Sequence, residues 1–405
     1  MASLSLLLSH QYGDCNSENS SNCPNNSTSN RNFDDLLKVV LKYTNFFHFL
    51  MMTYSDTLCS IISIFTNFFV LAIFMNKSAA SKVGKTVRFY YVLIAISDIV
   101  CVLDIRLIFS FSYLGLEWAT KGKYFLWMIK YHSIYCKIIL YIYNVSEQIS
   151  GFALVLFSLE RVIVIYFPFA SRTLITYTKV IMINAVVHMI IFIFNVHLLY
   201  ATIVIPTVVE YYMCLPEGNI EIFESLYWYT MGFQNYGLPT IFVIILDIFL
   251  VSKLMKEARY TKEHLHRNTR ATLECDAQST YVTSKKEKLA TISLAVIAAA
   301  HAIIYLPAAI TNGLIAPLSI GILKKNPLLY GTAQEIGFVC IHIATFAKAA
   351  SFCVFYFKVP YFRKHFNAYT CFIFCGLCRE VNLDVTSKTS TSISKSNVHT
   401  TISPL

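Results

Sequence analysis

Charged side chains inside long apolar stretches are the residues of this chain that could carry chemistry. Lys348 stands within ATFAKAA, while Glu147 and Asp98 stand in two earlier apolar stretches. An unpaired charge is expensive in hydrocarbon, so each such residue is a functional candidate and the lysine needs a carboxylate partner. Glu160 and Arg161 are adjacent, and a guanidinium can hold a carboxylate by two parallel hydrogen bonds. These residues predict charge pairing and recognition.

Catalysis is not predicted. The sequence shows no constellation of nucleophile and base, no HExxH motif and no pair of CxxC motifs at metal-ligand spacing. We therefore expect a protein that is not an enzyme and that has no catalytic residue, metal or cofactor.

Seven apolar stretches must position the charged residues. Each is about as long as the roughly 20 residues that an α-helix needs to cross a bilayer, where only internally hydrogen-bonded helices are stable. The fold class predicted is an all-α membrane protein, a seven-transmembrane helix bundle with a short amphipathic eighth helix. Such a chain serves signalling, transport or conduction. The stretches are 47–75, 86–113, 131–167, 180–205, 225–254, 289–314 and 332–357.

Charge sets the expected orientation. Only 14% of residues are charged, and with the N-terminus outside most of the 33 Lys and Arg fall in cytoplasmic loops and tail, as the positive-inside rule requires. The net charge of +10 is thus a topology signal, and no nucleic-acid partner is expected. Sequons at Asn19, Asn25 and Asn26 predict a glycosylated extracellular tail.

The third stretch carries the motif that identifies a family. Arg161 follows Cys136 by 25 residues within Glu160-Arg161-Val162, and Pro168 follows Arg161 by seven. In this the chain resembles the rhodopsin-like G-protein-coupled receptors over about residues 47–370. The resemblance implies a receptor in the plasma membrane, with an extracellular N-terminus and a heterotrimeric G protein as partner.

The resemblance also implies roles at both ends of helix three. Cys136 would pair with Cys214 in the second extracellular loop, and Arg161 would meet the G protein when helices three and six part. Glu160 belongs to the same G-protein coupling motif, and at rest Arg161 would pair with Glu287, which lies 20 residues before Pro307. Glu287 stands in Lys-Lys-Glu-Lys, so it could equally belong to a solvated charge run.

An internal polar network is implied as well. Asn67 and Asp98 match family positions in helices one and two. Relatives commonly hold a sodium ion between the helix-two Asp, a helix-three Ser and helix seven, where this chain has Ser150 and Ser351. We expect the Lys348 ammonium to replace that ion by pairing with Asp98; pairing with another acid is the alternative.

Departures from the family pattern concern activation. Helix four lacks its usual Trp, Tyr305 stands for a Trp of helix six, and Asp247 stands for a Tyr of helix five. The segment from Ser351 to Phe355 stands for Asn-Pro-x-x-Tyr. The pattern is that of a divergent branch, with an invertebrate peptide receptor as one possibility.

The ligand predicted is extracellular and cationic. Tyr143 stands where amine receptors have an Asp, which disfavours an amine, while Glu147 and Gln148 lie at pocket depth in helix three. Tyr305 and Asn312 complete the expected ligand-binding residues. Acidic outer loops, with Glu210, Glu217, Glu221 and Glu224, would attract a basic peptide. Glu147 could instead be a structural carboxyl bonded to a neighbouring helix.

The predicted domains are an extracellular tail (1–46), the seven-helix domain (47–358), an interfacial helix (359–370) and a cytoplasmic tail (371–405). Cys371, Cys375 and Cys378 are candidate palmitoylation sites beside this helix, giving a second anchor in the lipid bilayer. The Ser/Thr-rich end suits kinase and arrestin-like partners. A chemosensory receptor for a small molecule and a seven-helix transporter or channel remain alternatives.

Overall fold

The computed structural model describes most of the helical part of the chain. The described residues are 36, 39, 43, 46, 47, 50–76, 83–121, 123–124, 132–206, 212–216, 229–267, 292, 295–311 and 327–375. The predictions on Asn19, Asn25, Asn26, Glu287, Asn312 and Cys378 lie outside these residues.

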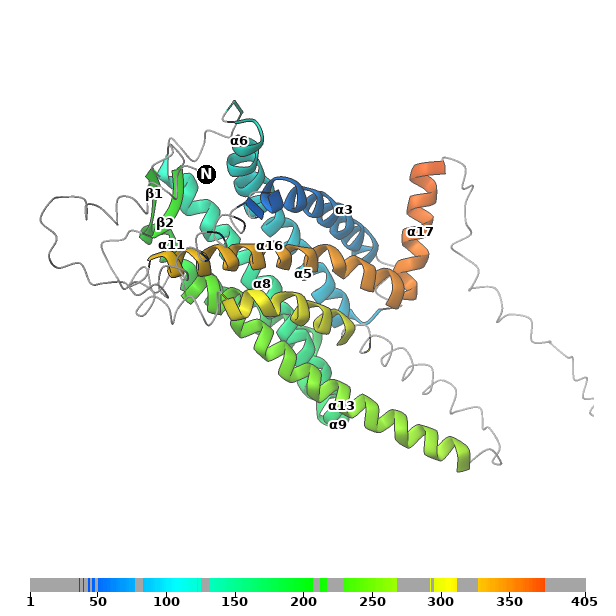
Figure 1. Ribbon diagram of the computed structural model, residues 1–405. Helices are drawn as coiled ribbons and strands as arrows, with labels where there is room; N and C mark the ends of the chain where they lie inside the picture. The colour runs from blue at the N-terminus through cyan, green and yellow to red at the C-terminus, as the bar shows by residue number, and fades with distance from the viewer. Residues whose placement is uncertain are drawn as a thin grey trace, which may run out of the picture.

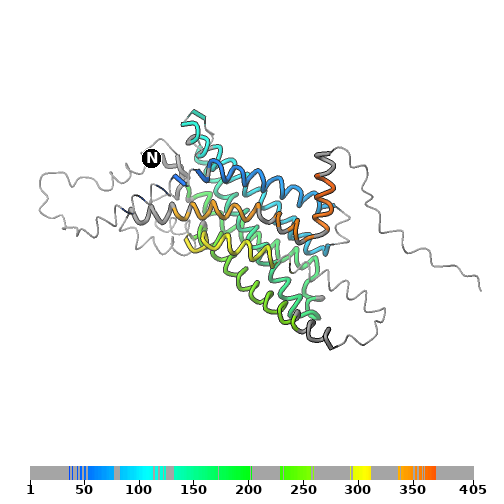
Figure 2. Tube along the Cα trace, turned by 45° about the vertical axis from the view of Figure 1, so that its right-hand side comes forward, coloured from blue at the N-terminus to red at the C-terminus, as the bar shows by residue number. Residues whose placement is uncertain are grey.

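Long helices run side by side and form a bundle (Figures 1 and 2). A small β-hairpin lies at one end of the bundle and helix α17 at the other; we call these the hairpin end and the α17 end. The long helices are α3 (Asp56–Met75), α5 (Lys85–Cys101), α8 (Ser133–Tyr166), α10 (Tyr177–Asn195), α13 (Leu238–Arg267) and α16 (Pro327–Lys358), with a further helical segment at Ala295–Thr311.

Shorter elements extend or join these helices. Among the described residues, π-helices precede or continue long helices: η1 (Met51–Ser55) lies before α3, η2 (Val102–Gly115) after α5, and η3 (Tyr229–Gly237) before α13. The others are α6 (Leu116–Ala119), α9 (Pro168–Leu174), α11 (Leu198–Ala201), β1 (Thr202–Pro206), β2 (Tyr212–Pro216) and α17 (Pro360–Cys375).

Several of these helices have the length and apolarity of membrane spans. Within the described residues, four qualify: Thr53–Met75, Ser133–Tyr166, Tyr177–Tyr200 and Gly232–Lys256. Many apolar side chains on α10 and α13 point outward, among them Ile193 and Ile248, which are 67% and 61% exposed. An outward apolar face is what lipid solvates. The α5–η2 segment is not among these four spans; it carries Asp98 and Arg106, which belong to the clusters described below.

The fourth predicted stretch was too long. Helix α10 ends at Asn195, and Thr202–Pro206 forms strand β1, which pairs antiparallel with β2. Thr202, Ile203, Val204 and Ile205 are all β-branched, which favours extended backbone, and Pro206 cannot donate to a ladder. In this register Val204 lies opposite Cys214, whose side chain is not described. Strand β2 contacts α8, where Cys136 is fully buried and disulfide-bonded.

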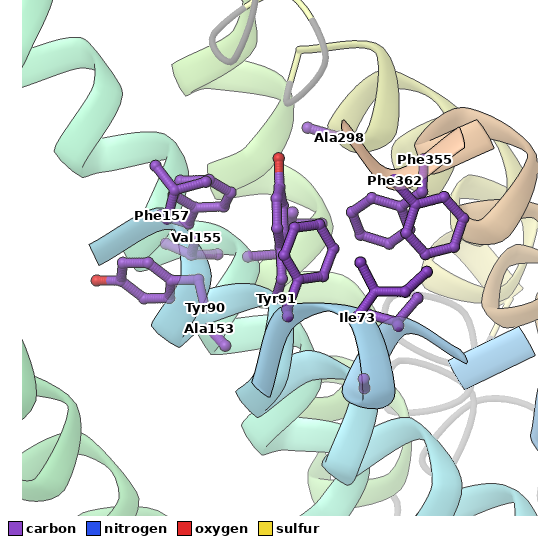
Figure 3. Close-up of a cluster of buried hydrophobic side chains, with 14 of the residues drawn as sticks. Ile73, Tyr90, Tyr91, Ala153, Val155, Phe157, Ala298, Phe355 and Phe362 are labelled. Carbon is purple, nitrogen blue, oxygen red and sulfur yellow. The ribbon is translucent and has the colours of Figure 1, made fainter. Parts of the chain in front are cut away.

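Helix α17 packs on the bundle through aromatic rings. Phe362 is fully buried and stacks on Phe74 of α3 with ring centroids 6.0 Å apart, and Phe366 lies 4.9 Å from Phe352. Figure 3 shows Phe362 beside Phe355 in the cluster that fills the α17 end. The apolar face predicted to lie in the membrane interface thus covers α3 and α16. The helix also runs to Cys375, five residues past the predicted end, and so includes Cys371 and Cys375, of which only the backbone is described.

Helix α8 is the centre of the bundle, because it contacts α5, α10, α13 and both strands of the hairpin. It approaches α13 closely at Gly151, where an added Cβ would lie 3.1 and 3.2 Å from the Cβ and Cγ of Pro239. Small residues let membrane helices approach in this way. Helix α13 continues to Arg267, well beyond the predicted 254, and extends past the other helices at the α17 end (Figure 1).

Replacing Gly151 by Val should therefore destabilise the protein by about 1–3 kcal/mol, the usual cost of overpacking. The measurement is thermal unfolding of the purified protein in one detergent. Gly84→Val is the control, because a Cβ there would meet only Val87 Cγ2, at 3.8 Å. A Gly151→Val melting temperature equal to that of the control would contradict the close contact.

Candidate functional site

A buried lysine lies between two carboxylates near the middle of the bundle. Lys348 Nζ on α16 is 2.9 Å from Asp98 Oδ1 on α5 and 3.2 Å from Glu147 Oε2 on α8. All three residues are at most 6% exposed. One ammonium therefore joins three helices in a medium of low dielectric constant, where paired charges attract strongly and unpaired ones are costly. We call Asp98, Glu147 and Lys348 the ionic centre.

Neutral donors complete the hydrogen bonding of both carboxylates. Ser150 Oγ donates to Asp98 Oδ1 at 2.7 Å. Cys101 Sγ donates to Glu147 Oε2 at 2.9 Å, and Tyr305 OH donates to Glu147 Oε1 at 2.8 Å. Tyr305 belongs to Ala295–Thr311, so a fourth helical segment is tied to the centre. Both Glu147 oxygens accept internal bonds, and a basic ligand group would have to displace Lys348 or Tyr305 to reach them.

The structure brings together Asp98, Ser150 and Lys348 of the predicted polar network. Asn67 is held within its own helix, since its Nδ2 donates to Ser63 O at 3.0 Å and Ser63 Oγ at 3.2 Å. Asn67 also lines a cavity of about 20 Å³ whose other walls are apolar or aromatic, including Tyr91, Phe157 and Phe355. For Ser351 only the backbone is described.

A sodium ion does not fit the residues of the ionic centre. The Lys348 ammonium already supplies a positive charge at hydrogen-bond distance from Asp98 Oδ1, the oxygen that also accepts from Ser150. An ion beside this oxygen would be repelled by the ammonium at close range, and the second carboxylate, that of Glu147, already accepts from Lys348, Cys101 and Tyr305. The lysine thus provides the cation as part of the chain.

Four buried amides form a second network towards the hairpin end. Gln148 Nε2 donates to Asn235 Oδ1 at 2.8 Å and to Asn195 Oδ1 at 3.3 Å, and Asn195 Nδ2 donates back to Gln148 Oε1 at 2.8 Å. Asn235 Nδ2 donates to Asn144 Oδ1 at 2.7 Å. All four are at most 2% exposed, so Gln148, predicted to face a ligand, instead links α8 to α10 and η3.

The other predicted ligand residues are also internal. Tyr143 is 2% exposed and its hydroxyl bonds that of Tyr236. Tyr305 is 3% exposed, packs 5.7 Å from the Tyr236 ring and stacks on His301 at 3.9 Å. Polar groups at this depth have no water to bond with, so they form hydrogen bonds with one another. The depth of a residue in the bundle therefore does not show whether its side chain bonds a neighbouring helix or a ligand.

A second ionic cluster was missed from the sequence. Arg106 NH1 on η2 is 3.3 Å from Asp56 Oδ2 on α3, and Arg106 NH2 donates to Ile341 O at 3.2 Å. His342 Nδ1 on α16 is 2.5 Å from the same Asp56 oxygen. The sequence did contain a signal for this cluster, because Asp56 and Arg106 are charged residues inside predicted helices. Which charges meet across helices is a matter of helix rotation, which the sequence does not give.

At the α17 end, Arg161 is held by its neighbour. Its NH2 is 2.6 Å from Glu160 Oε1, which also accepts from Thr86 Oγ1 at 2.9 Å. The guanidinium lies over the Phe157 ring, 5.5 Å from its centroid. Glu160 and Arg161 are 5% and 6% exposed. Arg161 therefore pairs with the acid that precedes it in the sequence, a contact that was not predicted, and Thr86 extends this contact to α5.

Comparison with known proteins decides the family. The model of the 7 transmembrane receptor (rhodopsin family) matches residues 66–318, more than half of the 405 residues. The chain belongs to the rhodopsin family of seven-transmembrane receptors. A search of curated proteins found no match. The match confirms the predicted membership and the seven-helix fold, and it makes the protein a membrane receptor and not an enzyme.

Within this receptor the ionic centre is a closed, fully paired site that fixes several helices relative to one another. Lys348→Met leaves the Asp98 and Glu147 carboxylates without their cation and should cost about 3–5 kcal/mol of stability. Asp98→Asn should also destabilise the receptor, but by less, because Lys348 keeps Glu147 as a partner. The double variant should recover part of the loss, measured as melting temperature and surface level. Fully additive losses would contradict the pairing of Lys348 with Asp98.

Because Lys348 supplies the positive charge of the ionic centre, the stability of the receptor should not depend on sodium. Replacing sodium by N-methylglucamine at constant ionic strength should leave the melting temperature of the ligand-free receptor unchanged. In Lys348→Met, Asp98, Glu147 and Ser150 lose the ammonium, so sodium should then stabilise the receptor relative to N-methylglucamine. Sodium-specific stabilisation of the wild-type receptor would show that a metal ion, and not Lys348, balances the site.

Proposed function

We propose that this receptor transmits the binding of an extracellular ligand to a heterotrimeric G protein through Arg161. The observation that carries the proposal is the placement of Arg161 in a receptor of this family. Arg161 is buried at the α17 end of α8, and its guanidinium is held by one carboxylate, that of Glu160. A guanidinium held by a single adjacent acid can be released when neighbouring helices move. Glu287 would supply a further resting-state partner.

The orientation proposed places the N-terminus and the hairpin end outside the cell, in the plasma membrane. The distribution of Lys and Arg in the sequence supports it. So does the oxidised state of Cys136, since disulfides persist in the extracellular environment. Glycosylation of Asn19, Asn25 and Asn26, palmitoylation of Cys371, Cys375 or Cys378, and kinase and arrestin-like partners at the Ser/Thr-rich tail belong to the same proposal.

The ligand proposed is a basic neuropeptide. Glu147 is the predicted contact for a basic ligand group, but it already has the Lys348 ammonium as its partner. The attraction of a basic ligand to the receptor would therefore arise mainly from the acidic loop around Cys214. A peptide can reach such a loop while a small molecule in the bundle cannot. Screening basic neuropeptides against calcium and cyclic-nucleotide reporters tests this proposal, and a response confined to small uncharged molecules would reject it.

Arg161→Ala should reduce G-protein activation to the level of cells without the receptor, because the residue that meets the G protein is lost. The readout is basal and peptide-evoked dissociation of G-protein sensors at matched surface expression. Lys179→Ala removes an exposed charge, whose Nζ donates to Thr173 O at 2.8 Å, and should leave signalling intact. Full signalling by Arg161→Ala would refute the proposed mechanism.

We also propose that the disulfide of Cys136 is made with Cys214, because strand β2 packs on α8. Removing a structural disulfide typically costs about 2–5 kcal/mol. Cys136→Ser and Cys214→Ser should each lower surface display of an N-terminally tagged receptor, and the double variant should be no worse than either. Cys353→Ser, at an exposed free cysteine, is the control. Wild-type display of either single variant would contradict the pairing.

A further inference from the structure

The second ionic cluster holds a histidine between a carboxylate and a guanidinium. His342 Nδ1 is 2.5 Å from Asp56 Oδ2 and 3.3 Å from Arg106 NH1, and this NH1 is 3.3 Å from the same Asp56 oxygen. All three residues are at most 6% exposed. An ionised carboxylate only accepts hydrogen bonds, so His342 Nδ1 carries a proton and donates it to Asp56. Arg106 NH1 therefore faces an N–H group of His342, which cannot accept a hydrogen bond from it.

The charges of this cluster balance only while His342 is neutral. Asp56 then supplies one negative charge and Arg106 one positive charge. A second proton on the imidazole would place two cations beside one carboxylate oxygen, and the buried site has no bulk water to solvate the excess charge. The two cations would also repel each other at short range in a medium of low dielectric constant. The cluster therefore accommodates a protonated His342 poorly unless the helices move.

Other titratable groups surround the cluster. The phenols and thiols that act on Asp56 or Arg106 are Tyr143, Tyr236, Cys59 and Cys101. Such groups ordinarily ionise above pH 8. Glu147 is bound to the Lys348 ammonium, and Asp104 lies against the backbone of Tyr143 on α8. Imidazole is the side chain whose charge ordinarily changes between pH 5 and 8, so His342 is the expected proton acceptor of the cluster.

The cluster lies on the outer side of the ionic centre in the orientation proposed above. Helix α3 begins at the hairpin end and ends beside α17 (Figure 1), and Asp56 is its first residue. On α16, His342 precedes Lys348 by six residues, about 9 Å along the helix axis. Arg106 NH2 also holds the α16 backbone, by donating to Ile341 O at 3.2 Å. Separating Arg106 from His342 would thus release α16, the helix that carries Lys348.

We propose that this cluster senses protons outside the cell: protonation of His342 separates α16 from Arg106 and favours the signalling state of the receptor. The inference rests on the proposed function, which supplies the orientation and the coupling to a G protein. A proton binds better to the state in which His342 has left Arg106, so acid shifts the equilibrium towards that state. The receptor thus responds to extracellular acidity as well as to its ligand.

Extracellular acid should raise basal coupling through His342. Between about pH 7.5 and about pH 6.0, G-protein sensors should report a rise of roughly threefold or more at matched surface expression, since one proton allows at most about tenfold per pH unit. His342→Asn keeps an N–H donor near the position of Nδ1 but cannot be protonated, so it should abolish the rise. No rise in the wild type, or an unchanged rise in His342→Asn, overturns the inference.

Two control variants should keep the rise. His132→Asn removes an exposed histidine from the hairpin end of α8. Asp104→Asn removes the carboxylate two residues before Arg106, so it shows whether His342 or this acid takes up the proton. A rise that is lost in Asp104→Asn and kept in His342→Asn overturns the assignment to His342.

The melting temperature of the purified, ligand-free receptor tests the site without a G protein. Acid should lower it more in the wild type than in His342→Asn, because the closed cluster excludes the added charge. Arg106→Gln removes the opposing cation, so protonated His342 and Asp56 then form a balanced pair. Acid should therefore stabilise Arg106→Gln relative to Arg106→Gln combined with His342→Asn. Absence of this reversal of sign contradicts the charge balance on which the inference depends.

Failure of the inference can be told apart from failure of the proposed function. If wild type and His342→Asn show the same pH dependence of melting temperature and of coupling, the proton site is overturned. The proposed function still stands in that case if Arg161→Ala abolishes coupling. If the melting temperatures behave as expected but the wild type couples to no G protein at any pH, the proposed function fails, and with it the signalling role of the cluster.

Discussion

Lys348 is the residue on which the arrangement of this bundle depends. A positive charge buried among membrane helices has no water to solvate it, so carboxylates must be brought to it from other helices. Asp98 and Glu147 come from α5 and α8, at 2.9 and 3.2 Å. Tyr305 adds the Ala295–Thr311 segment through Glu147. The rotation and depth of four helical segments are fixed by the need to satisfy this one ammonium.

The same constraint organises the rest of the interior. The amides of Gln148 and Asn195 bond each other in both directions, which joins α8 to α10. Asp56, Arg106 and His342 join α3, η2 and α16 nearer the hairpin end. Between these polar layers and α17 the core is aromatic, as Figure 3 shows around Tyr91 and Phe157. Polar pairing thus specifies which helices meet, and aromatic packing fills the α17 end.

Much of this architecture was predictable because its signals can be read within one helix at a time. These signals are the length of each apolar stretch and, in the third stretch, the spacing of Cys136, Arg161 and Pro168. The family match confirmed the fold that they indicated. The role of Glu147 was left open because it depends on two helices at once. The sequence allowed either a ligand contact or a bond to a neighbouring helix, and whether the side chain faces the pocket or Lys348 depends on the rotation of α8 relative to α16. The end of α10 was misplaced because β-branched residues suit both an apolar helix and a strand.

An experimental density map of the ligand-free receptor in sodium buffer tests the central claim most directly. The account predicts continuous density from Lys348 to both Asp98 and Glu147, with no separate ion beside Ser150. An ion-like peak between Asp98 and Ser150, with the Lys348 side chain turned away from both carboxylates, would contradict it.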